Sequence, residues 1–338
     1  MTTDPVPDTT QTHLVSVVIP VYKGERTLPD VIDELLAFTS EFVTPGSHQA
    51  RVDEIILVHD HGPDGSARVI RELASKHDVV RPVWLSRNFG QHAATLAGMA
   101  SSGGDWILTM DEDGQHDPAD IASMLDRAMG QRASVVYAKP TNVAPHGVFR
   151  NLSSWGAKRL IDVLVGSRSA ASFNSYRLVL GENGRSLAAY AGAGVYLDVA
   201  LGWLASNTTT TPVQLRGEGD RRSGYSTRSL ASHFWRMVLT SGTRLLRFVS
   251  VIGALFALIG LLTAVGLVVN RLFGGSLPPG WTSVMVVVLL GIGGLLLSLG
   301  IVAEYLGVAV NMAMGKPLYL ITSDPEQGPL GRQPSDGP

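Results

Sequence analysis

The segment VSVVIPVYKGERTLPDVIDELL, residues 15–36, contains one complete unit of an alternating fold. Residues 15–19 are mostly β-branched and stop at Pro20, which is the pattern of a short buried strand. After the polar residues 22–24, apolar side chains recur at the spacing of one helix face: Leu28, Val31, Ile32, Leu35 and Leu36. The segment therefore predicts a strand, a loop and a helix in that order.

The same pattern recurs downstream. Strands are predicted over residues 54–58, 83–85, 106–110 and 134–137, with helices around residues 69–73, 91–100 and 121–125. Repeated strand–helix units imply a mainly parallel sheet covered by helices on both faces. We therefore expect an α/β domain over residues 15–227, preceded by a disordered polar tail of residues 1–14.

Two uncharged stretches lie near the C-terminus. With 45% of its residues hydrophobic and 17% charged, the chain is apolar for a soluble protein. The excess lies in residues 248–270 and 281–303, and each stretch has roughly the 20 residues needed to cross a bilayer core. Glycines and prolines in residues 271–280 predict a short loop, so the sequence predicts a two-helix transmembrane hairpin. Buried core helices are the alternative, which the all-round apolarity disfavours.

Charge around the spans predicts their orientation. Four arginines precede the first span and Arg271 alone lies in the loop, which places the α/β domain and both termini in the cytoplasm at the cell membrane. Residues 228–247 mix these arginines with large apolar side chains and are predicted to lie along the membrane surface; an ordinary helix packed on the soluble domain is the alternative. Residues 304–338 form a cytoplasmic tail, which proline and glycine predict to be disordered after Ser323.

Composition excludes several kinds of site. The chain has no cysteine, which excludes thiolate metal sites, a catalytic cysteine and disulfides. A net charge of -2 argues against a nucleic-acid partner. Neither a G-x-G-x-x-G fingerprint nor a P-loop is present, so a metal ion and cationic side chains must handle any phosphate.

Polar residues follow each predicted strand, where ligands bind in parallel sheets. Asp111-Glu112-Asp113 directly follows an apolar strand, with Gln115 close behind. Clustered oxygen ligands at this place suit Mg²⁺ or Mn²⁺ shared with substrate phosphates, although an acidic triplet by itself is more often a solvated loop.

Two other groups of residues offer weaker signals. Arg87 and the arginines of residues 216–228 suit phosphate capture, with solvated charge or contact with anionic headgroups as the alternative. A histidine-based metallohydrolase centre is disfavoured because the chain has no H-E-x-x-H or similar spacing; its candidates would be His59, His61, His92 and His116.

Four segments share the order and spacing of a known family: VVIPVY at 17–22, VHDHGPDGS at 58–66, SRNFGQ at 86–91 and MDEDGQ at 110–115. They resemble family 2 glycosyltransferases with the GT-A fold. RSGYS at 222–226, AEYLG at 303–307 and GKPLY at 315–319 resemble the polyprenyl-phosphate glycosyltransferases, relatives of dolichyl-phosphate mannose synthase with C-terminal membrane helices. The resemblance covers residues 15–321 and implies a Rossmann-like GT-A catalytic domain followed by the membrane hairpin.

The resemblance also implies an activity. The chain would transfer a sugar from a nucleotide-sugar donor, with UDP favoured, to undecaprenyl or decaprenyl phosphate, giving a lipid-linked sugar for cell-envelope glycans. The mechanism implied is inverting, with a divalent cation on the leaving diphosphate and the lipid phosphate oxygen as the nucleophile.

Roles carry over residue by residue. Asp111, Asp113 and Gln115 resemble the motif that holds the cation, and Asp60 resembles the aspartate that reads the nucleotide base beside Pro20 and Tyr22. We add Arg87 and Glu112 to the donor pocket from their place at the strand ends. The residues expected at the acceptor phosphate are Arg150, Arg221, Arg222 and Tyr225.

The sequence departs from the family pattern at several positions. His59 stands where an aspartate is usual, and His61-Gly62 replaces the usual Gly-Ser. Ser175 stands where family members often carry an aspartate near the acceptor, which leaves Asp198 as a substitute catalytic base. Pro140 and Val308 each replace a usual basic residue.

Two other functions compete with this interpretation. A processive polysaccharide synthase would need a Q-x-x-R-W segment and usually more spans, and neither is present. A catalytically silent membrane scaffold is favoured by the lost aspartates. The small residues of the second span favour close helix packing and predict a homo-oligomer. Deleting residues 248–338 is expected to spare donor binding and to abolish transfer to long-chain lipid.

Overall fold

The computed structural model describes residues 11–142, 174–192, 196–205, 207–216, 280–315, 317–329 and 331, with isolated positions between 249 and 273. Its strands are β1 (His13–Val21), β2 (Phe42–Val43), β3 (Gln49–His59), β4 (Val80–Leu85), β5 (Trp106–Thr109), β6 (Val135–Pro140), β7 (Arg177–Leu180), β8 (Thr208–Val213) and β9 (Ile321–Thr322). Its helices are α1 (Leu28–Leu36), α2 (Ser66–Lys76), α3 (Gln91–Ala100), α4 (Asp120–Gln131), α6 (Gly181–Tyr190), α7 (Leu197–Leu204) and α10 (Trp281–Ala313).

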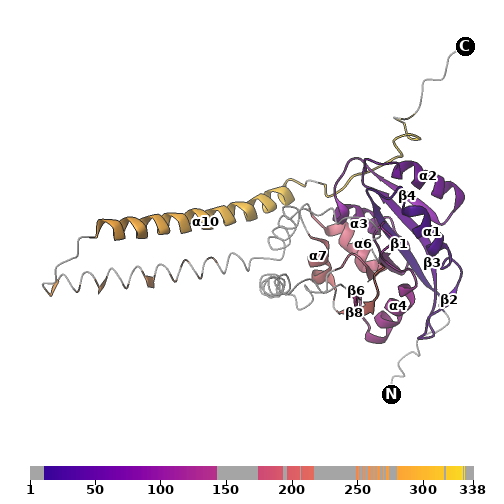
Figure 1. The fold of residues 1–338 in the computed structure, drawn as a ribbon, viewed down its shortest axis with the longest axis horizontal. Helices are drawn as coiled ribbons and strands as arrows, with labels where there is room; N and C mark the ends of the chain where they lie inside the picture. The colour runs from indigo at the N-terminus through magenta and orange to yellow at the C-terminus, as the bar shows by residue number, and fades with distance from the viewer. Residues whose placement is uncertain are drawn as a thin grey trace, which may run out of the picture.

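The strands form one mixed sheet, in the order β8-β6-β7-β5-β1-β3-β4-β9, with β2 paired to β3. Strands β5, β1, β3 and β4 are parallel neighbours, as the sequence predicts. Strands β7 and β9 run antiparallel to their neighbours. The prediction of a mainly parallel α/β sheet is confirmed, and Figure 1 shows helices packed against it.

Both faces of the sheet are covered. Alternate residues of β1 point to opposite sides, so Val17 and Ile19 join one core cluster while Val18 joins the other. Helices α1, α2 and α4 supply the first cluster, and α3, α6 and α7 supply the second. Helix α3 approaches β1 so closely that a Cβ at Gly98 would lie 2.3 Å from Val18 Cγ1. The sheet and helices thus form a rigid base for the loops at the strand ends.

The long helix α10 extends away from this domain (Figure 1). In the described part of the chain it is the one helix long and apolar enough to cross a membrane, over Gly291–Asn311, and 6% of that window is buried. Leu295 and Leu297 are both 68% exposed, which is costly in water and favourable in lipid. The helix has 33 residues and is about 50 Å long. It ends at Ala313, well past the predicted end at residue 303.

Several predicted segments cannot be compared with the structure. The proposed surface helix of residues 228–247 lies outside the described residues, and so does most of the first predicted span. Of the two predicted membrane helices, the second can be compared with the structure, where it is present as α10.

The prediction of a disordered tail after Ser323 is wrong for residues 324–329. Strand β9 pairs with β4, and Asp324 forms a two-pronged ion pair with Arg71 of α2. A two-residue strand paired with a partner far away in sequence leaves no local periodic pattern, which explains why the sequence did not indicate it.

Candidate active site

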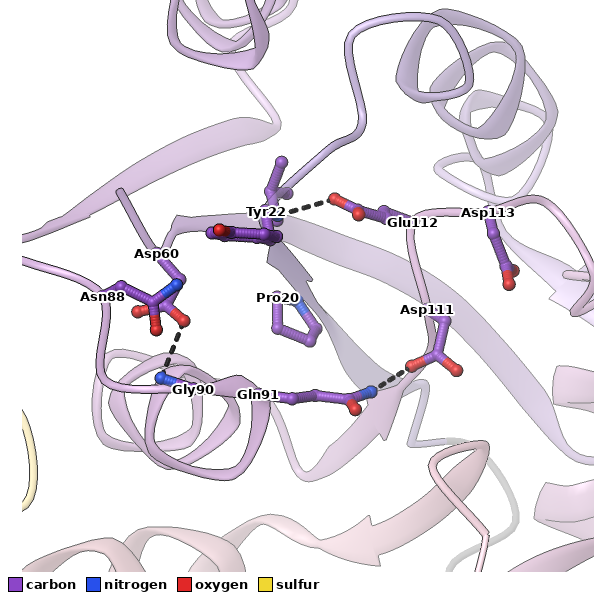
Figure 2. Close-up of a pocket in the computed structure, with 10 residues that line it drawn as sticks. Pro20, Tyr22, Asp60, Asn88, Gly90, Gln91, Asp111, Glu112 and Asp113 are labelled. Atoms are coloured by element: carbon purple, nitrogen blue, oxygen red, sulfur yellow. Dashed lines mark hydrogen bonds between the residues drawn. The ribbon is translucent and has the colours of Figure 1, made fainter. Parts of the chain in front are cut away.

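A cavity of about 380 Å³ opens at the carboxyl ends of the central parallel strands. Figure 2 shows Tyr22, Asp60 and Asn88 along one side and Asp111 and Asp113 along the other. This edge is where the sequence predicts a ligand site. The cavity is lined by Pro20, Val21, Tyr22, Asp60, Asn88, Gly90, Gln91, Asp111, Glu112 and Asp113.

Asp60 follows β3 and holds the loop that leads into α3. Its Oδ1 accepts the Phe89 N–H at 2.7 Å and its Oδ2 accepts the Gly90 N–H at 2.8 Å. Burial raises the pKa of this carboxyl, and the two backbone donors oppose that shift. Asp60 therefore lines the cavity and also fixes the position of Gly90, where the cavity wall turns into the helix.

Glu112 performs a similar task on the opposite wall. Its two carboxylate oxygens accept the backbone N–H groups of Tyr22 and Lys23 at 2.8 and 2.9 Å. Figure 2 shows Glu112 turned toward Tyr22, whereas Asp111 and Asp113 point elsewhere. Glu112 was expected to contact a donor, and in this structure its carboxylate holds the loop that carries Tyr22.

Asp111 is held between two side chains. Its Oδ1 accepts from Gln91 Nε2 at 2.6 Å and its Oδ2 accepts from the Ser175 hydroxyl at 2.7 Å. Asp113 Oδ1 accepts the backbone N–H of Gln115 at 3.1 Å, a contact within the turn. The two side-chain bonds fix the orientation of the Asp111 carboxylate. The Asp113 carboxylate contacts a backbone group of its own turn.

Asp111 and Asp113 fit one mode of cation binding. Within the described ranges no three His, Asp or Glu side chains gather into a ready metal cluster. Mg²⁺ is usually held by one or two carboxylates together with substrate phosphates and water, which two carboxylates on one cavity wall can satisfy. Gln115 is not among the residues that line the cavity, and its backbone N–H is what contacts Asp113.

Two of the candidate histidines, His59 and His116, pack against aromatic rings. His116 Nδ1 accepts the backbone N–H of Asp111 at 3.0 Å, so the proton of the neutral ring lies on Nε2. The His116 ring stacks on Tyr176 with centroids 4.4 Å apart, and burial lowers its pKa. His59 is buried beside Trp84, with ring centroids 5.2 Å apart. His59 and His116 thus pack within the domain, and the rejection of a histidine-based hydrolase centre remains a prediction from the sequence.

The loop of residues 61–65 packs tightly on the cavity wall. His61 adopts a φ of 53°, a left-handed conformation that glycine adopts most easily and histidine tolerates. At the next residue, a Cβ on Gly62 would lie 1.7 Å from the Tyr22 carbonyl oxygen. The backbones of the two loops therefore touch at this point, and this contact holds Tyr22, which lines the cavity, in place.

Gly62→Ala is expected to lower the free energy of unfolding by about 1–3 kcal/mol, because the Tyr22 backbone must move to admit the methyl group. Gly130→Ala is the matched control, since it lies within α4 where a Cβ meets nothing within 4 Å. Better helix propensity should make that control more stable by roughly 0.5–1 kcal/mol. Thermal unfolding of both variants measures the two changes in stability, which should have opposite signs. If Gly62→Ala is as stable as the wild type, the contact between Gly62 and Tyr22 is not rigid.

Some predicted site residues lie elsewhere. Asp198 does not line the cavity; it is buried in an ion pair with Arg177, which favours a structural role over the expected role of catalytic base. Arg87 is exposed outside the lining residues, with its guanidinium 4.2 Å from the Phe89 ring centroid. The expected acceptor residues Arg150, Arg221, Arg222 and Tyr225 lie outside the described residues.

Four residues of the site had no role in the sequence prediction. Val21 lies between Pro20 and Tyr22, and Asn88, Gly90 and Gln91 lie in the SRNFGQ segment. Their position after a predicted strand could have identified them. Ser175 was noticed only as a missing aspartate, and its contact with Asp111 depends on the antiparallel insertion of β7 beside β5.

Comparisons with known proteins identify the family of this chain. Residues 16–177 match the model of glycosyl transferase family 2. An undecaprenyl-phosphate 4-deoxy-4-formamido-L-arabinose transferase of Pseudomonas aeruginosa is 31% identical over 317 residues, which cover 91% of this chain and 89% of the relative. The protein of the same name from Pectobacterium carotovorum is 30% identical and covers 91% and 92% of the two chains.

Comparison with solved structures gives a partial match. Glucosyl-3-phosphoglycerate synthase from Mycobacterium tuberculosis, crystallised with Mn²⁺, UDP-glucose and phosphoglyceric acid, is 17% identical. It aligns over 69% of this chain and 79% of its own, with a TM-score of 0.49. The similarity to the transferases extends over nearly the whole chain, and the motif-bearing half matches the family model. The chain therefore belongs to glycosyl transferase family 2.

Proposed function

We propose that this protein transfers a sugar from a nucleotide-sugar donor, with UDP favoured, to a polyprenyl phosphate such as undecaprenyl or decaprenyl phosphate. The product is a polyprenyl-monophosphate sugar for cell-envelope glycan assembly. The observation that carries the proposal is the cavity itself, which has two carboxylates on one wall and Tyr22, Asp60 and Asn88 on the other. Similarity over nearly the whole chain to undecaprenyl-phosphate sugar transferases supports the choice of acceptor.

One wall of the cavity suits the base of a nucleotide sugar, and the other suits its diphosphate. The ring of Tyr22 and the polar groups of Asp60 and Asn88 suit a nucleotide base, which needs a stacking surface and hydrogen-bond partners. Asp111 and Asp113 would hold Mg²⁺ or Mn²⁺ against the diphosphate. When bound, the cation supplies charge neutralisation for the departing nucleoside diphosphate.

The transfer step needs little proton chemistry from the protein. A lipid phosphate oxygen forms a bond to the anomeric carbon while the bond from that carbon to the donor diphosphate breaks, with inversion. The attacking phosphate is already ionised at neutral pH, so a strong general base is less necessary than for an alcohol acceptor. This agrees with a serine at position 175, where relatives often have an aspartate.

We also propose the arrangement in the membrane. Residues 15–227 form the catalytic domain, residues 228–247 lie on the membrane surface, and residues 248–270 and 281–303 form the hairpin, with both termini in the cytoplasm. The exposed apolar surface of α10 supports the second span. Arg150, Arg221, Arg222 and Tyr225 would meet the acceptor phosphate, and close packing of the spans would allow a homo-oligomer.

The test is a donor screen with the purified full chain. The protein is mixed with undecaprenyl phosphate, Mg²⁺ or Mn²⁺ and a panel of UDP- and GDP-sugars, and lipid products are identified by mass spectrometry. A metal-dependent lipid product with one donor supports the proposal. Absence of product with every donor, together with no metal-dependent nucleotide binding by calorimetry, would favour a silent membrane scaffold.

Ser175→Ala is expected to weaken metal activation about tenfold, because the Ser175 hydroxyl fixes one carboxylate oxygen of Asp111. The metal concentration for half-maximal transfer should rise, while the rate at saturating metal stays close to that of the wild type. Ser175→Thr keeps the hydroxyl and serves as the control. An equal loss of rate at all metal concentrations would show that Ser175 acts on the acceptor instead.

A further inference from the structure

The chain returns to the catalytic domain after the apolar helix. Strand β9 pairs antiparallel with the end of β4, placing Ile321 opposite Leu85 and Thr322 opposite Trp84. The Ser86 N–H donates to the Leu320 carbonyl at 3.0 Å, so this pairing extends one residue past β4. Figure 1 shows this last segment beside β4 at the edge of the sheet.

An ion pair anchors the returning segment. Arg71 Nε and Nη2 donate to the two Asp324 oxygens, each at 2.7 Å, and Glu326 Oε2 lies 2.7 Å from Arg71 Nη1. The Arg71 and Asp324 side chains are only 15% and 13% exposed, so solvent screens this pair less than an ordinary surface pair. The Arg71 guanidinium also stacks over Trp84, 4.9 Å from the ring centroid. Helix α2, strand β4 and the tail therefore meet at one point.

Apolar contacts complete the attachment. Leu318 and Tyr319 pack against the core cluster that includes Val83 and Leu85 of β4. We refer to residues 318–326 as the C-terminal latch. It joins the end of α10 to the edge strand of the catalytic domain.

The same edge strand leads directly into the cavity wall. Residues 86–90 follow β4, and Asn88 and Gly90 among them line the cavity. Their position is held at one end by the bonds of Phe89 and Gly90 to Asp60 and at the other by the bond of Ser86 to the latch. A short loop fixed at both ends has little freedom, and releasing either end should loosen it.

We propose that the C-terminal latch positions the cavity-lining loop of residues 86–90, with Arg71 and Asp324 as its positioning residues. The segment leaving the membrane helix thereby orders the donor side of the catalytic domain. Deleting residues 248–338 removes the latch as well as the anchor, so, contrary to the expectation from the sequence, this deletion should loosen the cavity wall and weaken donor binding. The proposal rests on the proposed function only for the choice of UDP as ligand, because hydrogen exchange in residues 86–90 can be measured without a ligand.

Hydrogen–deuterium exchange of the full chain in detergent or nanodiscs tests the latch. In Asp324→Ala, the Phe89 and Gly90 amides, which bond to Asp60 and not to the latch, should exchange about tenfold faster than in the wild type. Amides of β1 and β5 in the centre of the sheet should keep their protection. Glu72→Ala is the matched control, because it breaks the exposed Arg68–Glu72 pair on the same helix.

The outcomes are distinct. Faster exchange confined to residues 86–90 and 318–326, with weaker binding of UDP in the presence of Mn²⁺, supports the proposal. If only residues 318–326 lose protection, the tail docks passively and the proposal is overturned. If Asp324→Ala unfolds the domain, the milder Asp324→Asn must show the same localised effect, and its absence would also overturn the proposal. If the wild-type chain transfers no sugar to lipid while Asp324→Ala still speeds exchange in residues 86–90, the proposed function fails and the latch proposal stands.

Discussion

Asp113→Ala is expected to lower transfer to polyprenyl phosphate by about 10²–10³-fold, because it removes one of the two carboxylates proposed to hold the cation. The fold should survive, since Asp113 contacts the backbone N–H of Gln115 within its own turn. Loss of the carboxylate should also remove the difference in nucleotide affinity with and without Mn²⁺. Transfer assays and calorimetry with UDP measure the two effects.

Two controls make this result specific. Asp53→Ala removes a carboxylate that does not line the cavity, pairs with Arg51 and is 40% exposed, and this variant should leave transfer unchanged. Chelation of the metal should reduce the wild type to the level of Asp113→Ala and have little further effect on the variant. Metal-dependent transfer that persists in Asp113→Ala would remove Asp113 from the metal site.

The strands and their loops could be predicted because the relevant signals are local. Residues 15–19 of β1 are all buried and point alternately to the two faces of the sheet, which a continuous β-branched run predicts, and parallel strands end at the same edge of a sheet. The sequence therefore placed Tyr22, Asp60 and Asp111 in one crevice, where the structure has them. Local patterns do not show which partner each carboxylate takes. Asp60 and Glu112 both bind backbone N–H groups of neighbouring loops, and those contacts exist only once the loops meet.

Elements defined by distant pairing were not predicted. Strand β7 enters the sheet antiparallel between β5 and β6, and it brings Ser175 to Asp111 and Arg177 toward Asp198. Strand β9 has two residues and pairs with a strand that ends more than two hundred positions earlier. Neither pairing leaves a periodic signal in the sequence, so the ion pair of Asp198 with Arg177 and the docked tail could be recognised only in the three-dimensional structure.

The Arg177–Asp198 pair is enclosed within the domain. Arg177 is 2% exposed and Asp198 is 3% exposed, and Tyr137 also hydrogen-bonds the Asp198 carboxylate. Arg177 Nε donates to Thr109 Oγ1 at 3.1 Å, which connects the pair to the strand before the acidic motif. Removing one partner of such a pair leaves an uncompensated buried charge, which costs far more than the pair itself contributes.

Asp198→Ala is therefore expected to destabilise the domain by about 3–5 kcal/mol, a large share of the roughly 5–15 kcal/mol typical of folded domains. Thermal unfolding should show a midpoint lower by roughly 10 °C. A catalytic base would behave differently: Asp198→Ala would fold normally and lose about 10²–10⁴-fold in turnover. The double variant Arg177→Met with Asp198→Leu separates the two roles, because replacing both charges by apolar side chains is often close to neutral for stability. A structural pair predicts that this double variant recovers most of the stability and transfers sugar, whereas no leucine can accept a proton from the acceptor.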